Sequence, residues 1–130
     1  MKLYISGPIT GCEDGNKPKF NFTSKMVRKM GFTAINPWDL ELVEPRKGWT
    51  DNMKRDIKFL SECDGVVLLK GWEQSKGARL EVIVAYSLGM KFYRWDKLTQ
   101  DLRFVPIVVE EFEITPLITS DQWDGGSAND

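Results

Sequence analysis

The stretch from residue 63 to residue 88 constrains the fold more than any other part of the chain. Residues 66–69 form a continuous apolar run that begins with two valines, which is typical of a strand covered on both faces. Gly71 ends this run, and Ser75 stands where a helix N-cap belongs. Residues 78–88 are almost all apolar, so we predict a largely buried helix. A buried strand followed by a loop and a buried helix indicates a parallel α/β unit.

Glu81 is the only acidic residue of this predicted helix. A buried charge without a partner costs several kcal/mol, so the carboxylate needs a partner, a wet cleft or a function. In the simplest interpretation Glu81 pairs with a nearby Lys or Arg or faces solvent. The alternative is a ligand site, because ligands of parallel sheets bind beyond the carboxyl ends of the strands. Its place near a helix N-terminus leads us to expect an ionised side chain.

The whole chain of 130 residues fits one domain spanning residues 1–130, in which the Gly-, Ser- and Asp-rich residues 121–130 are expected to form a flexible tail. A net charge of −1 does not indicate long nucleic acid as a partner. No apolar run is long enough to span a bilayer, and a strand pattern starts directly at Lys2, so we expect a cytoplasmic protein without a leader peptide. Cys12 and Cys63 fit reduced thiols and form neither a metal nor a disulfide framework.

The sequence contains no histidine, which excludes Ser-His-Asp and Cys-His catalysis and the commonest zinc sites. If the protein is an enzyme, carboxylates are therefore its leading acid–base groups.

Strand and helix patterns alternate along the chain. Further strands are predicted at residues 2–6, 32–35 and 91–95, with edge pieces at 104–109 and 114–118, and further helices at 21–30 and 50–62. Residues 12–18 are expected to form a mobile loop and residues 39–48 an irregular lid or rim. This order predicts an α/β fold, a doubly wound sandwich with a mostly parallel sheet of about five strands.

Two further features of the sequence suggest a ligand site, the loop after the first strand and a pair of tryptophans. The loop Gly7-Pro8-Ile9-Thr10-Gly11 follows the first strand, and its free backbone N–H groups suit a phosphate or a sugar, although an ordinary turn has the same composition. Trp38 and Trp49 suit stacking on a base or plain packing.

Asp56 lies at the margin of the apolar stripe of its helix. Lys54, Arg55 or Lys58 would neutralise it in the simplest interpretation, whereas partial burial would raise its pKa and suit it to general-acid catalysis.

Three pieces together resemble the nucleoside 2-deoxyribosyltransferase superfamily: residues 3–11, the pair Arg55-Asp56 ahead of residues 63–67, and residues 75–81 followed by Ala85 and residues 89–91. That group includes deoxynucleoside 5′-monophosphate N-glycosidases and small, phage-associated relatives. The resemblance covers residues 2–91 and implies a flavodoxin-like fold, no cofactor and no metal. It also implies a homodimer or larger homo-oligomer, often with a neighbouring subunit completing the site.

The resemblance implies that Glu81 is the nucleophile that attacks the anomeric carbon, and that Asp56 assists proton transfer to the base. The residues it implies for substrate binding follow the first strand or open the last predicted helix: Tyr4, Gly7, Pro8, Ile9, Thr10, Gly11, Ser75 and Gly77.

Two departures from the family bear on the substrate. Relatives that act on free nucleosides carry an acid near the position of Ser75, whereas Ser75-Lys76 would not repel a 5′-phosphate. Against this, Pro8 and Thr10 replace a serine and an arginine of the monophosphate glycosidases. Two hypotheses follow: an enzyme that cleaves or transfers at the N-glycosidic bond, or a non-catalytic protein that binds a nucleotide or a nucleotide signal in the same pocket.

Overall fold

The computed structural model describes residues 1–108, and at its centre lies a five-stranded sheet in the order β2-β1-β3-β4-β5. Four strands run parallel, and β5 pairs antiparallel with β4. The strands are β1 (Lys2–Ser6), β2 (Thr33–Ile35), β3 (Gly65–Leu68), β4 (Lys91–Asp96) and β5 (Asp101–Phe104). The helices are α1 (Lys17–Lys29), α2 (Pro37–Val43), α3 (Trp49–Leu60) and α4 (Lys76–Ser87), with 3-10 helices η1 (Glu13–Asn16) and η2 (Trp72–Gln74).

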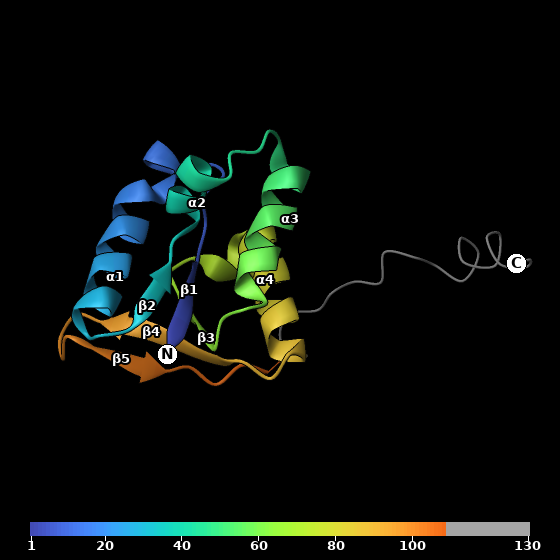
Figure 1. Ribbon diagram of the computed structural model, residues 1–130. Helices are drawn as coiled ribbons and strands as arrows, with labels where there is room; N and C mark the ends of the chain where they lie inside the picture. The colour runs from blue at the N-terminus through green and yellow to red at the C-terminus, as the bar shows by residue number, and fades with distance from the viewer. Residues whose placement is uncertain (109–130) are drawn as a thin grey trace, which may run out of the picture.

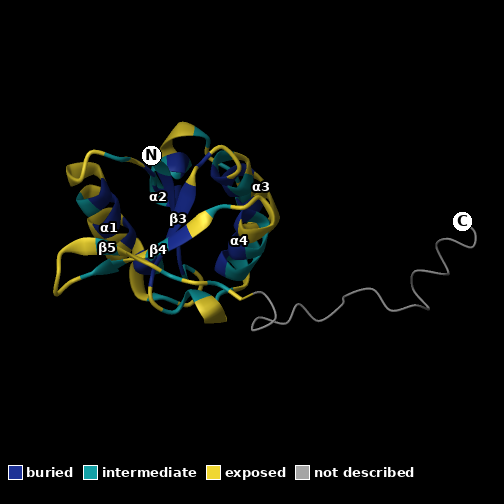
Figure 2. Ribbon diagram, turned by 90° about the horizontal axis from the view of Figure 1, so that it is seen from below, coloured by how far each residue is buried: buried dark blue, intermediate teal, exposed yellow. Residues whose placement is uncertain are grey.

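Helices cover both faces of the sheet (Figure 1): α1 and α2 lie on one side, and α3 and α4 on the other. The strands alternate between two apolar clusters, because successive side chains of a strand point to opposite faces. Leu3 and Ile5 of β1 pack with α1, whereas Tyr4 packs with α3 and α4. Figure 2 shows β3 and the inner sides of the helices as buried. The prediction of a doubly wound, flavodoxin-like α/β sandwich is confirmed.

The strand order reverses between β1 and β3, since the chain moves outward from β1 to β2 and then crosses back to β3. At such a point the loops that follow the two strands lead to opposite faces and leave a crevice at the carboxyl ends. The loop of residues 7–11 follows β1, and residues 69–75 follow β3. The fold therefore brings the two segments that the sequence analysis singled out to one place.

Several predicted boundaries are wrong. Residues 12–18 form η1 and the start of α1 where a mobile loop was predicted; Pro18 is compatible with the first helical turn, where its missing N–H is not needed. Residues 39–48 were predicted to be irregular, yet α2 occupies their first half. The Asn36 side chain accepts a hydrogen bond from the Trp38 N–H at 3.0 Å and caps this helix.

The predicted edge strand at 104–109 is also misplaced. β5 ends at Phe104, because residues 97–100 form a tight turn that lets the chain pair at once with β4. The predicted strand at 114–118 and the predicted tail at 121–130 lie outside the described residues. Within residues 1–108, no helix has the length and apolar character needed to cross a membrane.

Candidate active site

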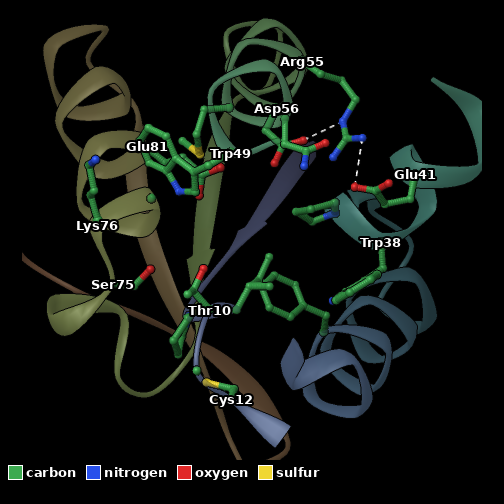
Figure 3. A pocket seen from close by; sticks show the side chains of 18 of the residues that line it. Thr10, Cys12, Trp38, Glu41, Trp49, Arg55, Asp56, Ser75, Lys76 and Glu81 are labelled. Carbon is green, nitrogen blue, oxygen red and sulfur yellow. Dashed lines mark hydrogen bonds and ion pairs between the residues drawn. The ribbon is translucent and has the colours of Figure 1, made fainter. Parts of the chain in front are cut away.

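A cavity of about 1000 Å³ lies at the carboxyl ends of β1 and β3 (Figure 3). It is lined by residues 8–12 of the loop after β1, by parts of α1, α2 and α3, and by the segment that runs from Gly71 into α4. Both carboxylates singled out from the sequence, Asp56 of α3 and Glu81 of α4, line it. The volume is within the range of small-molecule sites.

The Glu81 carboxyl group is buried and held by two hydroxyl groups of β1. Tyr4 Oη donates to Glu81 Oε2 at 2.5 Å, and Ser6 Oγ donates to Glu81 Oε1 at 2.7 Å. Tyr4 and Ser6 are two residues apart on one strand, so both side chains point to the face that α4 covers. The sheet thus fixes the position of each carboxyl oxygen.

Burial raises the pKa of Glu81 to about 8, and the nearby charge of Asp56 acts in the same direction, while the hydrogen bonds from Tyr4 and Ser6 oppose the rise. The expectation that Glu81 stays ionised at neutral pH is therefore wrong. Glu81 is the sixth residue of α4, beyond the first turn in which the helix dipole stabilises an anion, so desolvation dominates. Burial also raises the pKa of Tyr4 well above its ordinary value, which keeps its hydroxyl proton available.

Asp56 belongs to a chain of charges that crosses the cavity wall. Arg55 Nε lies 2.9 Å from Asp56 Oδ1, and Arg55 Nη1 lies 3.2 Å from Glu41 Oε1. The Arg55 side chain is only 2% exposed, so this guanidinium is fixed between the two carboxylates. Burial raises the pKa of Asp56, and the ion pair with Arg55 offsets part of that rise. Of the candidate partners, Arg55 is therefore the one that pairs with Asp56.

Two tryptophans contribute flat apolar surface to the cavity. Trp38 Nε1 donates to the Gly15 carbonyl oxygen at 3.3 Å, which fixes the indole against η1. The Lys76 ammonium group lies 4.2 Å from the centre of the Trp49 ring, a cation–π distance. The cavity therefore combines flat rings with carboxyl groups.

Most of the substrate-binding residues predicted from the sequence line the cavity: Pro8, Ile9, Thr10, Gly11, Ser75 and Gly77. Ser75 Oγ also accepts a hydrogen bond from the Ala78 N–H at 3.2 Å, which confirms it as the N-cap of α4.

Tyr4 and Gly7 lie outside the lining. Tyr4 is fully buried below Glu81, and Gly7 packs so closely that an added Cβ would lie 2.6 Å from Leu69 Cβ.

The sequence reading missed Ser6 and Glu41. Ser6 carried a usable signal, because it is a small polar residue on the same face of the strand as Tyr4 and at the end where ligands bind. Glu41 carried none, since its role depends on α2, which was not predicted. Among the described residues, the Cys, Asp and Glu side chains form no group of three or more that could hold a metal ion.

A family model described as "Domain of unknown function (DUF4406)" matches residues 1–93. A search of curated proteins found no significant match.

Two solved structures share the fold. A 2-deoxyribosyltransferase from the psychrotolerant bacterium Bacillus psychrosaccharolyticus superposes with a TM-score of 0.58 at 21% identity, over 72% of this chain and 71% of that one. A 2-desoxiribosyltransferase from Leishmania mexicana gives a TM-score of 0.55 at 19% identity, over 73% of this chain and 65% of its own length. At these identities the likeness establishes a common fold.

The raised pKa of Glu81 predicts how stability depends on pH. The folded protein keeps the proton up to about pH 8, whereas the unfolded chain loses it near the ordinary pKa of 4.5. The stabilising contribution of this group is therefore complete below about pH 4.5 and is lost as the pH rises to about 8, by roughly 1 kcal/mol per pH unit. Glu81→Gln cannot ionise, so its free energy of unfolding should improve relative to wild type between pH 5 and pH 8.

Urea unfolding at three pH values measures this difference. Glu62→Gln, at an exposed glutamate near the end of α3, is the matched control and should follow wild type. Parallel profiles for wild type and Glu81→Gln would show that Glu81 is ionised throughout.

Proposed function

The chain belongs to the DUF4406 family, and we propose that it cleaves or transfers at the N-glycosidic bond of deoxynucleosides or deoxynucleoside 5′-monophosphates. The observation that carries the proposal is the Glu81 carboxyl group, buried at a ligand-sized cavity and held by Tyr4 and Ser6. Enzymes that cleave glycosidic bonds commonly use two carboxyl groups, one as nucleophile and one as acid–base catalyst. Glu81 and Asp56 both line the cavity, and both oxygens of Glu81 are held by hydrogen bonds.

In the proposed reaction, a Glu81 oxygen attacks the anomeric carbon of the sugar. The bond from this carbon to the base nitrogen breaks, and the base leaves with its electron pair and takes a proton from Asp56. In the second step Asp56, now a carboxylate, accepts a proton from water or from a second base. This nucleophile attacks the anomeric carbon, and the ester bond to Glu81 breaks, which releases the Glu81 carboxylate. The transition states resemble an oxocarbenium ion, which a carboxylate in a dry site stabilises.

The proposal needs Glu81 ionised and Asp56 protonated at the same time. The pKa of Glu81 near 8 means that the ionised fraction is small at neutral pH before a substrate binds. Developing positive charge on the sugar favours the ionised form, so the energetic benefit of the carboxylate is largest in the transition state. Tyr4 and Ser6 support this form, because their hydroxyl groups stabilise the carboxylate more than the acid.

Trp38 and Trp49 are proposed to hold the base, since both line the cavity and flat rings stack on any nucleobase. Pro8, Ile9, Thr10 and Gly11, with Ser75 and Gly77, are proposed to surround the sugar and its 5′ end. The absence of an acid at Ser75 and the presence of Lys76 favour a 5′-monophosphate.

The wider parts of the proposal rest on the resemblance over residues 2–91. They are a homo-oligomeric enzyme in the cytoplasm, a neighbouring subunit that completes the site, and a single domain over the whole chain.

A second candidate is a protein that binds a nucleotide in this cavity without turnover. Two observations favour it: Pro8 and Thr10 supply no charge for a phosphate, and Arg55 is already committed to Asp56 and Glu41. Chromatographic detection of free base after incubation with each deoxynucleoside and each 5′-monophosphate separates the two, because only an enzyme releases base.

Glu81→Gln tests the nucleophile. The amide is nearly the same size but cannot form the ester, so base release should fall by about a thousandfold or more. Glu62→Gln serves as the control and should retain the wild-type rate. A folded Glu81→Gln protein with wild-type turnover would remove Glu81 from the mechanism.

Asp56→Asn tests the proton donor. An amide cannot donate an acid proton, so the single-turnover rate should fall by about 10²-fold or more, with a smaller change in ligand affinity. The profile of rate against pH should also lose the decrease that results from deprotonation of Asp56 as the pH rises. Glu41→Gln is the matched control, since it removes the other carboxylate partner of Arg55, and we expect a much smaller effect. Equal effects of both substitutions would assign Asp56 to the ion pair alone.

Ser75→Asp tests the substrate class. Aspartate is also a good N-cap, so α4 should remain intact. Its charge would repel a 5′-phosphate by roughly 1 to 4 kcal/mol at about 4 Å, depending on how wet the site is. Calorimetric titration should then show at least tenfold weaker binding of monophosphates, with nucleosides unaffected or bound more tightly. Equal changes for both ligands would mean that Ser75 does not contact the 5′ end.

A further inference from the structure

A second cavity, of about 830 Å³, lies next to the first and has no part in the proposed reaction. It opens between the start of α1, the end of β3 and the turn between β4 and β5. Several cationic and aromatic residues line it, among them Phe22, Lys70, Trp72, Arg94, Trp95 and Lys97. Its volume alone is sufficient for one nucleotide-sized ligand.

The lining is strongly basic. Lys19, Lys70, Arg94 and Lys97 line the cavity, against Glu73 as the single acid. Within residues 1–108, none of the three lysines forms an ion pair, and Arg94 reaches Asp96 only at 3.8 Å with its side chain 56% exposed. These cations are available to an anion, unlike the buried Arg55 of the first cavity.

The same cavity carries aromatic surface. Phe22 is 47% exposed although it is a large apolar residue, and Trp72 and Trp95 are partly buried beside it. Rings next to exposed cations suit a ligand that has both a flat ring and negative charge. We propose that this cavity is a second binding site, which takes a nucleoside phosphate with its ring against the aromatic residues and its phosphates on the lysines.

The geometry indicates a ligand separate from the one in the first cavity. The two cavities share Gly71 alone among their lining residues, and an added Cβ on Gly71 would lie 3.4 Å from Pro8 Cγ. Pro8 lies close to this shared glycine and lines the first cavity only. η2 contributes to both: Trp72 and Glu73 line the second cavity, and Gln74 lines the first.

Calorimetric titration of the full chain with ADP tests the site. Glu81→Gln protein is used so that no turnover intervenes, which makes the result independent of the proposed reaction. The double substitution Lys70→Ala with Lys97→Ala should weaken one ADP site by at least tenfold. Lys25→Ala with Lys29→Ala, at exposed lysines of α1 outside both cavities, removes the same charge and should leave binding unchanged. Adenosine and inorganic pyrophosphate should each bind at least tenfold more weakly than ADP.

The number of sites separates the two proposals. Two ADP molecules per chain, one of them lost in the Lys70/Lys97 variant, support both cavities. One molecule, lost in that variant and unaffected by Ser75→Asp, supports the second cavity, while release of free base from deoxynucleosides and their 5′-monophosphates decides the proposed function separately. Equal binding by the two double variants overturns the second site. One molecule that is weakened by both Lys70/Lys97 and Ser75→Asp also overturns it, because a single ligand would then extend across both cavities. A single-stranded oligodeoxynucleotide that binds tenfold more tightly than ADP would assign the lysines to a nucleic-acid strand instead.

Discussion

The two hydroxyl groups that hold Glu81 are the contact on which the candidate site depends. The buried Glu81 carboxyl group keeps its proton to about pH 8, and Tyr4 and Ser6 each donate a hydrogen bond to one of its oxygens. The contact also joins β1 to α4 through Ser6 and Glu81, two residues that lie 75 positions apart in the chain. It therefore ties the central strand to the helix that opens the cavity, and it places the acid at the end of the sheet where ligands bind.

The strand order explains why the chemistry gathers at this point. Because β1 and β3 are neighbours while their crossovers lead to opposite faces, the loop after β1 and the start of α4 meet over the middle of the sheet. α3 packs beside α4 and brings Asp56 to the same cavity. Gly77 permits this approach, since an added Cβ would lie 3.2 Å from Met53 Sδ. The packing of α3 against α4 thus brings the two carboxylates to one cavity. Hydrogen bonds from β1 hold Glu81 in place, and the ion pair with Arg55 holds Asp56.

What the sequence could predict was local. The central strand, the N-cap at Ser75 and the isolated acid at Glu81 all follow from patterns within a few residues, and the structure confirms the fold, the strand and the cap. The helix α2 was missed because proline and glutamate suggested a rim, although Asn36 caps it. The protonation of Glu81 was missed because desolvation depends on elements distant in the chain, whereas the helix dipole can be read locally.

The distribution of cations separates the two cavities in function. All 18 basic residues lie within residues 1–108, against 13 acidic ones, so the described part carries an excess of positive charge that the near-zero net charge of the chain conceals. In the first cavity Arg55 is buried between two carboxylates, and the Lys76 ammonium group lies over the Trp49 ring. In the second cavity the lysines are exposed and have no ion pair among the described residues. An anion gains most where cations have no prior partner to lose, because exchange of one ion pair for another yields little net free energy. The second cavity therefore offers more unpaired positive charge to a phosphate group than the first cavity does.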